Sequence, residues 1–185
     1  MSHRAKAKGG PGRNGIAIGA NAALRNRCGA ACWWIAAVPL PGRCGYAGDL
    51  DRQSTLALIG RYYDCFNAGD WQGMLECLSE RIVHDINQGQ SQHGKPAFAA
   101  FLAHMERCYR EKLTDIVIMA SDDGARASAE FVVHGEYIAT DEGLPEATGQ
   151  RYVLPAGAFF ALEGGQISRV TVYYNLADWT AQVCP

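Results

Sequence analysis

Asp85 is the residue whose type and surroundings most clearly suggest chemistry. It lies in the apolar segment Ile82–Ile86, and strand alternation places it on the face of Val83, pointing inward. A carboxylate among apolar side chains is costly to bury unless it is hydrogen-bonded or functional, and burial raises its pKa toward that of an effective general base. Alternatively, Asp85 braces the polar turn at 87–94, and its spacing is equally consistent with both interpretations.

The other candidate groups suggest less. By the same alternation His84 points away from Asp85, and His104 and His134 fall on polar faces, so we expect solvated histidines rather than metal ligands. From residue 49 onward the chain lacks the GxGxxG, Walker A, HExxH and GxSxG patterns. We therefore expect no metal and no cofactor.

Three helices are predicted to come first. Apolar residues recur at helical spacing from Asp51 to Ala68, and Gly69 is a natural stop. Asp70 can cap a short second helix that begins at Trp71. Pro96 suits the first turn of a third helix, which buries Phe98, Phe101, Leu102, Met105 and Tyr109.

After Leu113 the pattern changes to alternation, which predicts strands. Residues 113–120 and 125–138 flank the hairpin signal Asp122-Asp123-Gly124, and residues 152–162 and 166–176 flank a second turn. Pro155 and Gly157 predict an edge, a bulge or a bend in the third long strand.

Helices followed by antiparallel strands predict an α+β fold, with three N-terminal helices packed on a curved, mainly antiparallel sheet. Asp85 would then lie at the bottom of an internal pocket. The large apolar side chains that would bind a substrate there, or else simply fill the core, are Phe66, Phe101, Met105, Phe131, Phe159 and Tyr174.

Charge divides the chain at residue 49. Residues 1–48 hold seven of the 17 basic residues and none of the 19 acidic ones, so the remainder carries a net charge of −9. A domain this acidic is a poor binder of phosphate backbones and anionic lipid, which argues against nucleic-acid and membrane partners. The seven cysteines include no CxxC pair and no zinc spacing, so we expect free thiols in a reducing cytoplasm.

Residues 1–48 are rich in Gly, Ala and Arg and show neither helical nor strand periodicity. A secretory signal, an organellar transit peptide and a disordered extension, or translated sequence upstream of the true start, all remain open, and we favour the last group. The folded domain is accordingly expected at 49–185.

Several segments carry a resemblance to a known family. Arg61-Tyr62, Ala68-Gly69-Asp70 and Val83-His84-Asp85 resemble the ketosteroid isomerases, as do Gly94 and the turn at 165–167. The runs at 85–89, 141–145 and 149–155 are similar to a ketosteroid-isomerase-related group within the SnoaL-like part of the NTF2-like superfamily. The resemblance covers residues 50–180 and implies an NTF2-like cone, a small apolar carbonyl ligand and a homodimer.

Carried over by position, the resemblance implies that Asp85 is the general base and that Tyr62 donates a hydrogen bond to the enolate oxygen. The second donor falls on Gly157, which has no side chain. Two hypotheses follow. The first is an enzyme in which Asp85 acts in isomerisation, cyclisation or dehydration. The alternative is a non-catalytic NTF2-like ligand-binding or dimerisation module.

Overall fold

The computed structural model describes residues 50–87 and 89–184, and the predictions for residues 1–48 lie outside this part. The order of elements is α1 (Arg52–Ala68), α2 (Trp71–Glu76), β1 (Leu78–Asp85), β2 (Ser91–His93), α3 (Lys95–Cys108), β3 (Tyr109–Ala120), β4 (Arg126–Tyr137), β5 (Gln150–Glu163), β6 (Gln166–Tyr174) and α4 (Leu176–Val183). None of these helices is long and apolar enough to cross a membrane.

The first helices begin and end where their capping residues predict. The Asp51 carboxylate accepts a hydrogen bond from the Ser54 amide at the start of α1. Gly69 ends that helix with a left-handed φ of 68°, which glycine adopts without steric cost. The Asp70 carboxylate then caps α2 by accepting from the Gly73 amide, 2.9 Å away.

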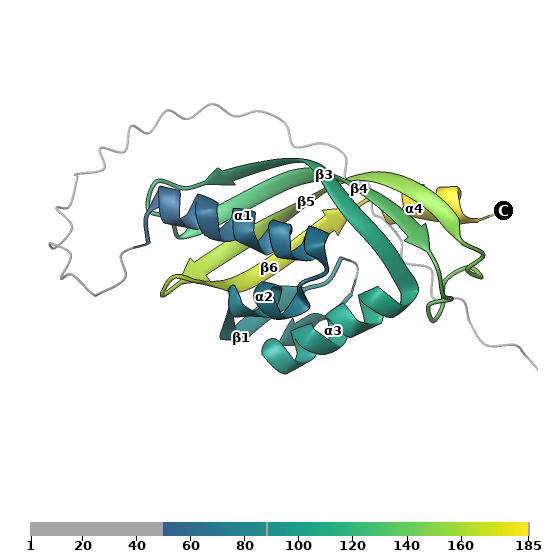
Figure 1. Ribbon diagram of the computed structural model, residues 1–185, viewed down its shortest axis with the longest axis horizontal. Coiled ribbons are helices and arrows are strands. Elements are labelled where there is room, and N and C mark those ends of the chain that lie inside the picture. Colours follow the sequence, from purple (N-terminus) through teal and green to yellow (C-terminus); the bar gives the residue numbers. More distant parts are fainter. Residues whose placement is uncertain (1–49, 88, 185) are drawn as a thin grey trace, which may run out of the picture. The chain divides into compact units, whose positions relative to one another are not determined.

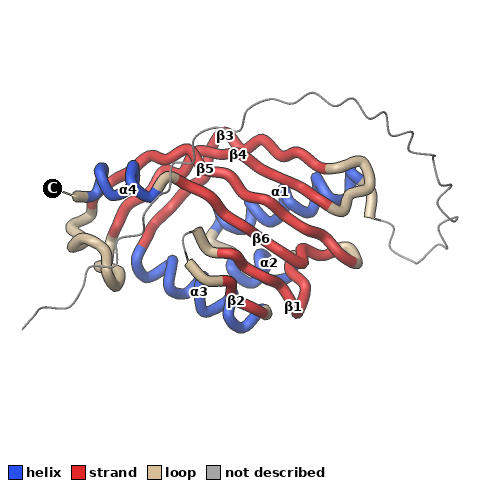
Figure 2. Tube along the Cα trace, turned by 180° about the vertical axis from the view of Figure 1, so that it is seen from behind, coloured by secondary structure: helices blue, strands red, loops and turns tan. Residues whose placement is uncertain are grey.

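The six strands form one sheet in the order β2-β1-β6-β5-β4-β3. All neighbours are antiparallel except β1 and β6. The sheet curves, and α1, α2 and α3 lie against one face of it (Figure 1), which we call the inner face. Seen from behind, the opposite outer face carries none of these three helices (Figure 2). The predicted α+β architecture is therefore confirmed.

Of the three alternatives predicted from Pro155 and Gly157, an edge is excluded because β5 pairs with β4 on one side and β6 on the other, and the register irregularity of β5 with β6 lies elsewhere, between Ala161 and Leu162. β6 ends at Tyr174, opposite Ala156, so on that side no strand faces Pro155. Proline lacks a backbone N–H, and it is tolerated here because no ladder bond is required of it.

The final helix, α4, was not predicted, since the alternation was extended to residue 176. Asn175 begins it by accepting hydrogen bonds from the amides of Ala177 and Asp178. Its Trp179 is buried and packs edge-on against Tyr137 and Tyr152. This helix therefore helps to close one end of the core.

Candidate active site

A cavity of about 570 Å³ lies between the inner face of the sheet and the helices. Its volume is in the range of small-molecule sites. The lining is mainly apolar and aromatic and includes most of the residues predicted for a pocket: Tyr62, Phe66, Phe101, Met105, Phe131 and Tyr174. The polar side chains that also line it are His84, Asn87, Gln92, His104, Glu111 and Asp141.

Asp85 does not line this cavity, and the prediction that it points inward is wrong. On β1 the buried residues are Leu78, Ile82 and His84, so near the end of the strand the inward face is that of Ile82 and His84 rather than that of Val83 and Asp85. The Asp85 carboxylate accepts hydrogen bonds from Ser91 (2.5 Å), Thr171 (2.9 Å) and Arg169 (2.6 Å). The hydrogen bond from Ser91, then those from Thr171 and Arg169, outweigh partial burial and lower the pKa of Asp85. These bonds join β1 to β2 and β6, and a catalytic role for Asp85 remains an untested prediction.

Two further predicted positions also lie on the outer face. Phe159 is 59% exposed and contacts the ring of Tyr173, whereas its neighbour Phe160 is buried and lines the cavity. Gly157 pairs with the outward-facing Glu130 and Tyr173, so it cannot mark a donor position inside the cavity. The residues beside it that do line the cavity are alanines, which offer no donor either.

His84 is the cavity residue at the position where an inward carboxylate was expected. It is 3% exposed and packs against the rings of Phe98 and Phe101. Burial lowers its pKa, although the amide of Gln92 and the carboxylate of Asp85 oppose this shift. The imidazole is therefore neutral at neutral pH.

Glu111 is one of two carboxyl groups that line the cavity, the other being Asp141. Glu111 lies on β3, and its Oε1 accepts a hydrogen bond of 2.5 Å from the Tyr152 hydroxyl. Burial raises the pKa of Glu111, and the bond from Tyr152 opposes the shift without cancelling it. A carboxylate whose pKa is raised by its place in an apolar cavity is a stronger base than an exposed carboxylate.

Gly135 explains how Tyr152 reaches Glu111. Glu111 on β3 pairs with Gly135 on β4, which in turn pairs with Tyr152 on β5. A Cβ atom at Gly135 would lie 2.1 Å from Cζ of Tyr152, so the tyrosine ring passes directly over the glycine. The absence of a side chain at this position lets the hydrogen bond span the strand between the two residues.

A second polar cluster fastens the loop between β4 and β5 to the cavity rim. Oδ2 of Asp141 lies 2.9 Å from His104 Nε2 and 2.8 Å from the Tyr109 hydroxyl, which donates to it. Partial burial raises the pKa of Asp141, but the bonds from His104, Tyr109 and the Glu142 amide outweigh it and lower the pKa overall. His104 is therefore not the solvated residue that helical spacing predicted.

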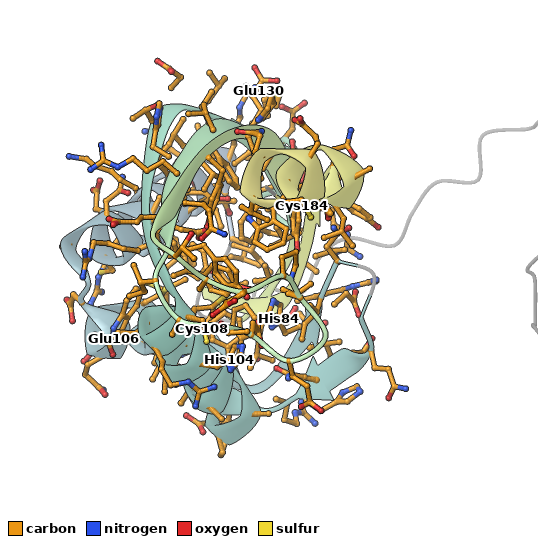
Figure 3. The ribbon with its side chains drawn as sticks, turned by 90° about the vertical axis from the view of Figure 1, so that its right-hand side faces the viewer. His84, His104, Glu106, Cys108, Glu130 and Cys184 are labelled. Atoms are coloured by element: carbon orange, nitrogen blue, oxygen red, sulfur yellow. The ribbon has the colours of Figure 1, made fainter. Side chains whose placement is uncertain are left out.

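The same region holds the described residues that could ligate a metal. Ligand atoms of His104, Cys108 and Asp141 lie within 4.8 Å of one another, and Figure 3 shows the two helical residues close together on α3. His104 Nε2 is bonded to Asp141, however, and its Nδ1 lies 2.9 Å from Arg107 Nη2. Both imidazole nitrogens are thus already engaged, and the arrangement is that of a hydrogen-bond network.

Sequence reasoning missed Glu111, Tyr152 and Asp141 as site residues. The strand was predicted to start at Leu113, so the inward alternation of Tyr109, Glu111 and Leu113 was cut short. That alternation, with a carboxylate between two apolar neighbours, is the signal that could have identified Glu111.

This α+β domain, whose curved sheet and helices enclose a mainly apolar cavity lined also by Glu111 and Asp141, has the kind of concave apolar site that is typical of small-molecule sites. Residues 59–170 match the SnoaL-like domain, and the chain belongs to this family. Among solved structures, an NTF2-like protein from Burkholderia xenovorans LB400 shares the fold at 14% identity (TM-score 0.60; 73% of this chain and 99% of that chain covered).

Other solved structures are much more similar in sequence. A proposed polyketide cyclase from Pseudomonas putida KT2440 is 60% identical, with a TM-score of 0.70, covering 70% of this chain and 98% of that chain. Another, from Silicibacter sp. TM1040, is 57% identical, with a TM-score of 0.71, covering 74% and 99%. Among curated proteins, a search finds no match.

Proposed function

We propose that this SnoaL-like protein is an enzyme that acts on a small, largely apolar carbonyl compound by general acid–base chemistry in the internal cavity. The observation that carries the proposal is Glu111, a cavity-lining carboxyl group of raised pKa that is hydrogen-bonded to Tyr152 in a mainly apolar, aromatic cavity. We assign to Glu111 the role that the resemblance gave to Asp85, because the Asp85 carboxylate lies on the outer face.

The raised pKa favours proton transfer to and from carbon. A carboxylate is a stronger base the higher its pKa, and a group that titrates closer to neutral pH can both accept and return a proton. Ionised Glu111 would take a proton from the carbon next to a carbonyl group. Tyr152 holds the carboxylate in place and stabilises its charge through their hydrogen bond.

Tyr62 remains the proposed donor to the developing enolate oxygen. Its ring lines the cavity, and burial, followed by the neighbouring Tyr63 and Cys77, raises its pKa well above the usual value. Tyr62 therefore stays protonated and can donate a hydrogen bond. Phe66, Phe101, Met105, Phe131 and Tyr174 supply the apolar walls.

The similar structures suggest which reaction the enolate enters. Relatives at 57% and 60% identity are described as proposed polyketide cyclases. In a cyclisation the enolate carbon attacks a second carbonyl carbon of the same molecule, forming a C–C bond. The second carbonyl oxygen then takes the proton that Glu111 had accepted. Isomerisation would use the same proton transfer and return the proton to carbon.

Turnover of enolisable compounds tests this proposal. Linear polyketones and β,γ-unsaturated steroid ketones would be assayed by the absorbance of the cyclised or conjugated product. Glu111→Gln should reduce turnover about 10²-fold or more, whereas Asp85→Asn serves as the matched carboxylate control and should retain it. Turnover that survives Glu111→Gln and is lost in Asp85→Asn would return the base to Asp85. Binding without turnover would favour the non-catalytic module.

We also propose that the protein is a homodimer. The outer face presents five exposed apolar or aromatic side chains on three of the six strands: Val117 and Met119 on β3, Val153 and Phe159 on β5, and Tyr173 on β6. Exposed apolar groups gathered on one sheet face are typical of contact surfaces.

A further inference from the structure

Buried polar atoms without partners concentrate in the cavity. Among the described residues five such side-chain atoms occur, and three of them belong to residues that line the cavity: Tyr63 Oη, His84 Nδ1 and Gln92 Oε1. A buried polar atom that lacks a hydrogen bond is destabilising, and most such atoms in folded proteins are paired. Their gathering in one cavity indicates where a ligand supplies the missing bonds.

His84 and Gln92 are neighbours on the inner face. They are direct partners in the antiparallel pairing of β1 with β2, so their side chains project on the same side of the sheet. The side chain of Gln92 approaches the imidazole closely enough to raise its pKa as a weak hydrogen-bond acceptor would, but the contact does not have hydrogen-bond geometry, and Nδ1 and Oε1 both lack a geometrically formed hydrogen bond among the described residues. The two atoms thus form a pair that one small polar group can bridge.

The surroundings hold this pair in place. On the inner face, the rings of Phe98 and Phe101 contact the imidazole at centroid distances of 4.8 and 4.5 Å. On the outer face, Asp85 and Ser91, which are also direct partners of β1 and β2, are joined by a side-chain hydrogen bond. The outward carboxylate therefore fixes the two strands that carry the inward pair.

A hydroxyl group matches the pair better than other oxygen functions. A hydroxyl can donate one hydrogen bond to Gln92 Oε1 and accept another from the Nδ1–H of His84, so it satisfies both atoms when Nδ1 carries the imidazole proton. A carbonyl or ether oxygen only accepts and would leave Gln92 Oε1 unpaired. A carboxylate would require a positive charge, which a neutral imidazole does not supply.

We infer that His84 and Gln92 form a hydroxyl-binding subsite, and that the ligand of the cavity is an apolar molecule that carries a hydroxyl group in addition to its carbonyl group. The inference deepens the proposed function and rests on it only in placing the carbonyl group near Glu111. Glu111 lies on β3 and His84 on β1, at opposite sides of the sheet order, so the two polar sites belong to different parts of the cavity wall.

Binding of two matched probes tests the subsite without any turnover. β-Naphthol and β-methylnaphthalene differ only in a hydroxyl group in place of a methyl group. Their dissociation constants for the full-length protein would be measured by tryptophan fluorescence or calorimetry. We expect the wild-type protein to bind β-naphthol about tenfold more tightly, the effect of roughly two net hydrogen bonds.

Substitutions in the cavity show which residues cause the preference for β-naphthol over β-methylnaphthalene. His84→Phe keeps an aromatic ring between Phe98 and Phe101 and should abolish the preference for β-naphthol while leaving the affinity for β-methylnaphthalene within about threefold of wild type. Gln92→Leu should reduce the same preference, and this variant tests the subsite independently if the His84→Phe variant does not fold. Glu111→Gln should keep the preference.

Two kinds of binding result would overturn the proposed hydroxyl subsite. Equal affinity of the wild-type protein for both probes, or no binding of β-naphthol, would overturn the inference. A preference that survives His84→Phe and Gln92→Leu but disappears in Glu111→Gln would place hydroxyl binding at Glu111 and also overturn it. Because these experiments measure binding and not turnover, a negative result would overturn the hydroxyl subsite alone. The acid–base role of Glu111 is tested separately by turnover.

Discussion

The Tyr152 hydroxyl donates to Glu111 Oε1 across an intervening strand, over a donor–acceptor distance of 2.5 Å. Glu111 lies on β3 and Tyr152 on β5, and Gly135 of β4 lies between them in register. The bond therefore depends on a residue between the two that has no side chain. It ties the candidate acid–base group to the sheet and limits how far burial raises its pKa.

Gly135→Ala should displace Tyr152 and weaken this bond. The added Cβ would lie 2.1 Å from Cζ of Tyr152, a ring atom that cannot move without repacking against Trp179. We expect a loss of about 1–3 kcal/mol in the free energy of unfolding, measured by urea denaturation. Gly60→Ala is the matched control, since a Cβ there meets nothing within 4 Å in the helix α1 and should be neutral or slightly stabilising. Equal effects of the two substitutions on the free energy of unfolding would contradict the close contact between the Tyr152 ring and Gly135.

Tyr152→Phe should move the pH dependence of turnover. The hydrogen bond from Tyr152 lowers the pKa of Glu111 against the dominant effect of burial, which raises it. Removal of the hydroxyl leaves burial less opposed, so the pKa rises further and the base form appears only at higher pH. The rise of kcat/KM with pH should therefore shift upward in Tyr152→Phe. A downward shift or an unchanged profile would remove Glu111 as the titrating base.

The free energy of unfolding should also depend on the ionisation of Glu111, and the direction of that dependence on pH is defined. The folded-state pKa of Glu111 lies above its unfolded value near 4.5. The contribution of protonated Glu111 to the stability of the folded protein is fully present below that unfolded value and is lost as pH rises through the folded-state pKa. Stability of the wild-type protein relative to Glu111→Gln should thus decrease as pH increases over this window. The difference between the two denaturation midpoints, measured pH by pH, checks the prediction.

Most of the fold could be read from the sequence because its signals are local. Asp51, Gly69 and Asp70 mark helix ends through their own side-chain or backbone chemistry. The hairpin turn at Gly124 has the positive φ that its sequence predicts. α4 was missed because its apolar residues follow an alternating strand directly, and only the Asn175 cap separates the two.

The candidate site was harder to predict because it depends on register. A shift of one residue in a strand moves every side chain to the other face. On β1 both Ile82 and Val83 are apolar, so the pattern did not show which face is inward, and the inward positions expected for Val83 and Asp85 belong to Ile82 and His84. The same one-residue error placed Phe159 in the pocket instead of Phe160. The contact between Glu111 and Tyr152 joins residues 41 positions apart, which no local pattern reveals.

Asp85→Asn should affect stability rather than the chemistry in the cavity. The substitution removes the charge that pairs with Arg169, and the Asp85 side chain is 19% exposed, so solvent screens part of the interaction. We expect a loss of about 1–2 kcal/mol on thermal or urea unfolding. Asp122→Asn, at a side chain that is 98% exposed, should change stability by less than about 0.5 kcal/mol. A stability equal to wild type would show that the outward bonds contribute little.

The outer face provides a test of the proposed homodimer. Phe159 is 59% exposed and Tyr173 is 55% exposed, and their rings contact each other on adjacent strands. Phe159→Glu would place a charge at the centre of any apolar contact there, which is strongly unfavourable when desolvated. We expect light scattering coupled to gel filtration to give a dimer for the wild type and a monomer for the variant. Probe affinity of the cavity should be unchanged, since Phe160 rather than Phe159 lines it. A wild-type monomer would contradict the proposal.

Asp141→Asn should release the loop between β4 and β5 from the cavity rim. Its carboxylate accepts hydrogen bonds from Tyr109 and the Glu142 amide and pairs with His104, and together these bonds lower its pKa below the usual 3.8. The stabilisation is therefore present above that value and is lost as pH falls through the folded-state pKa. Asparagine keeps the size of the side chain but not the charge, so we expect a loss of about 1–2 kcal/mol in the free energy of unfolding at neutral pH that vanishes in strong acid.

Hydrogen exchange at the amides of residues 141–144 should accelerate in the Asp141→Asn variant. Because Leu144 of this loop lines the cavity, probe dissociation should also become faster. Unchanged exchange and dissociation rates would mean that packing of Leu144, rather than the Asp141 hydrogen bonds, holds the loop in place.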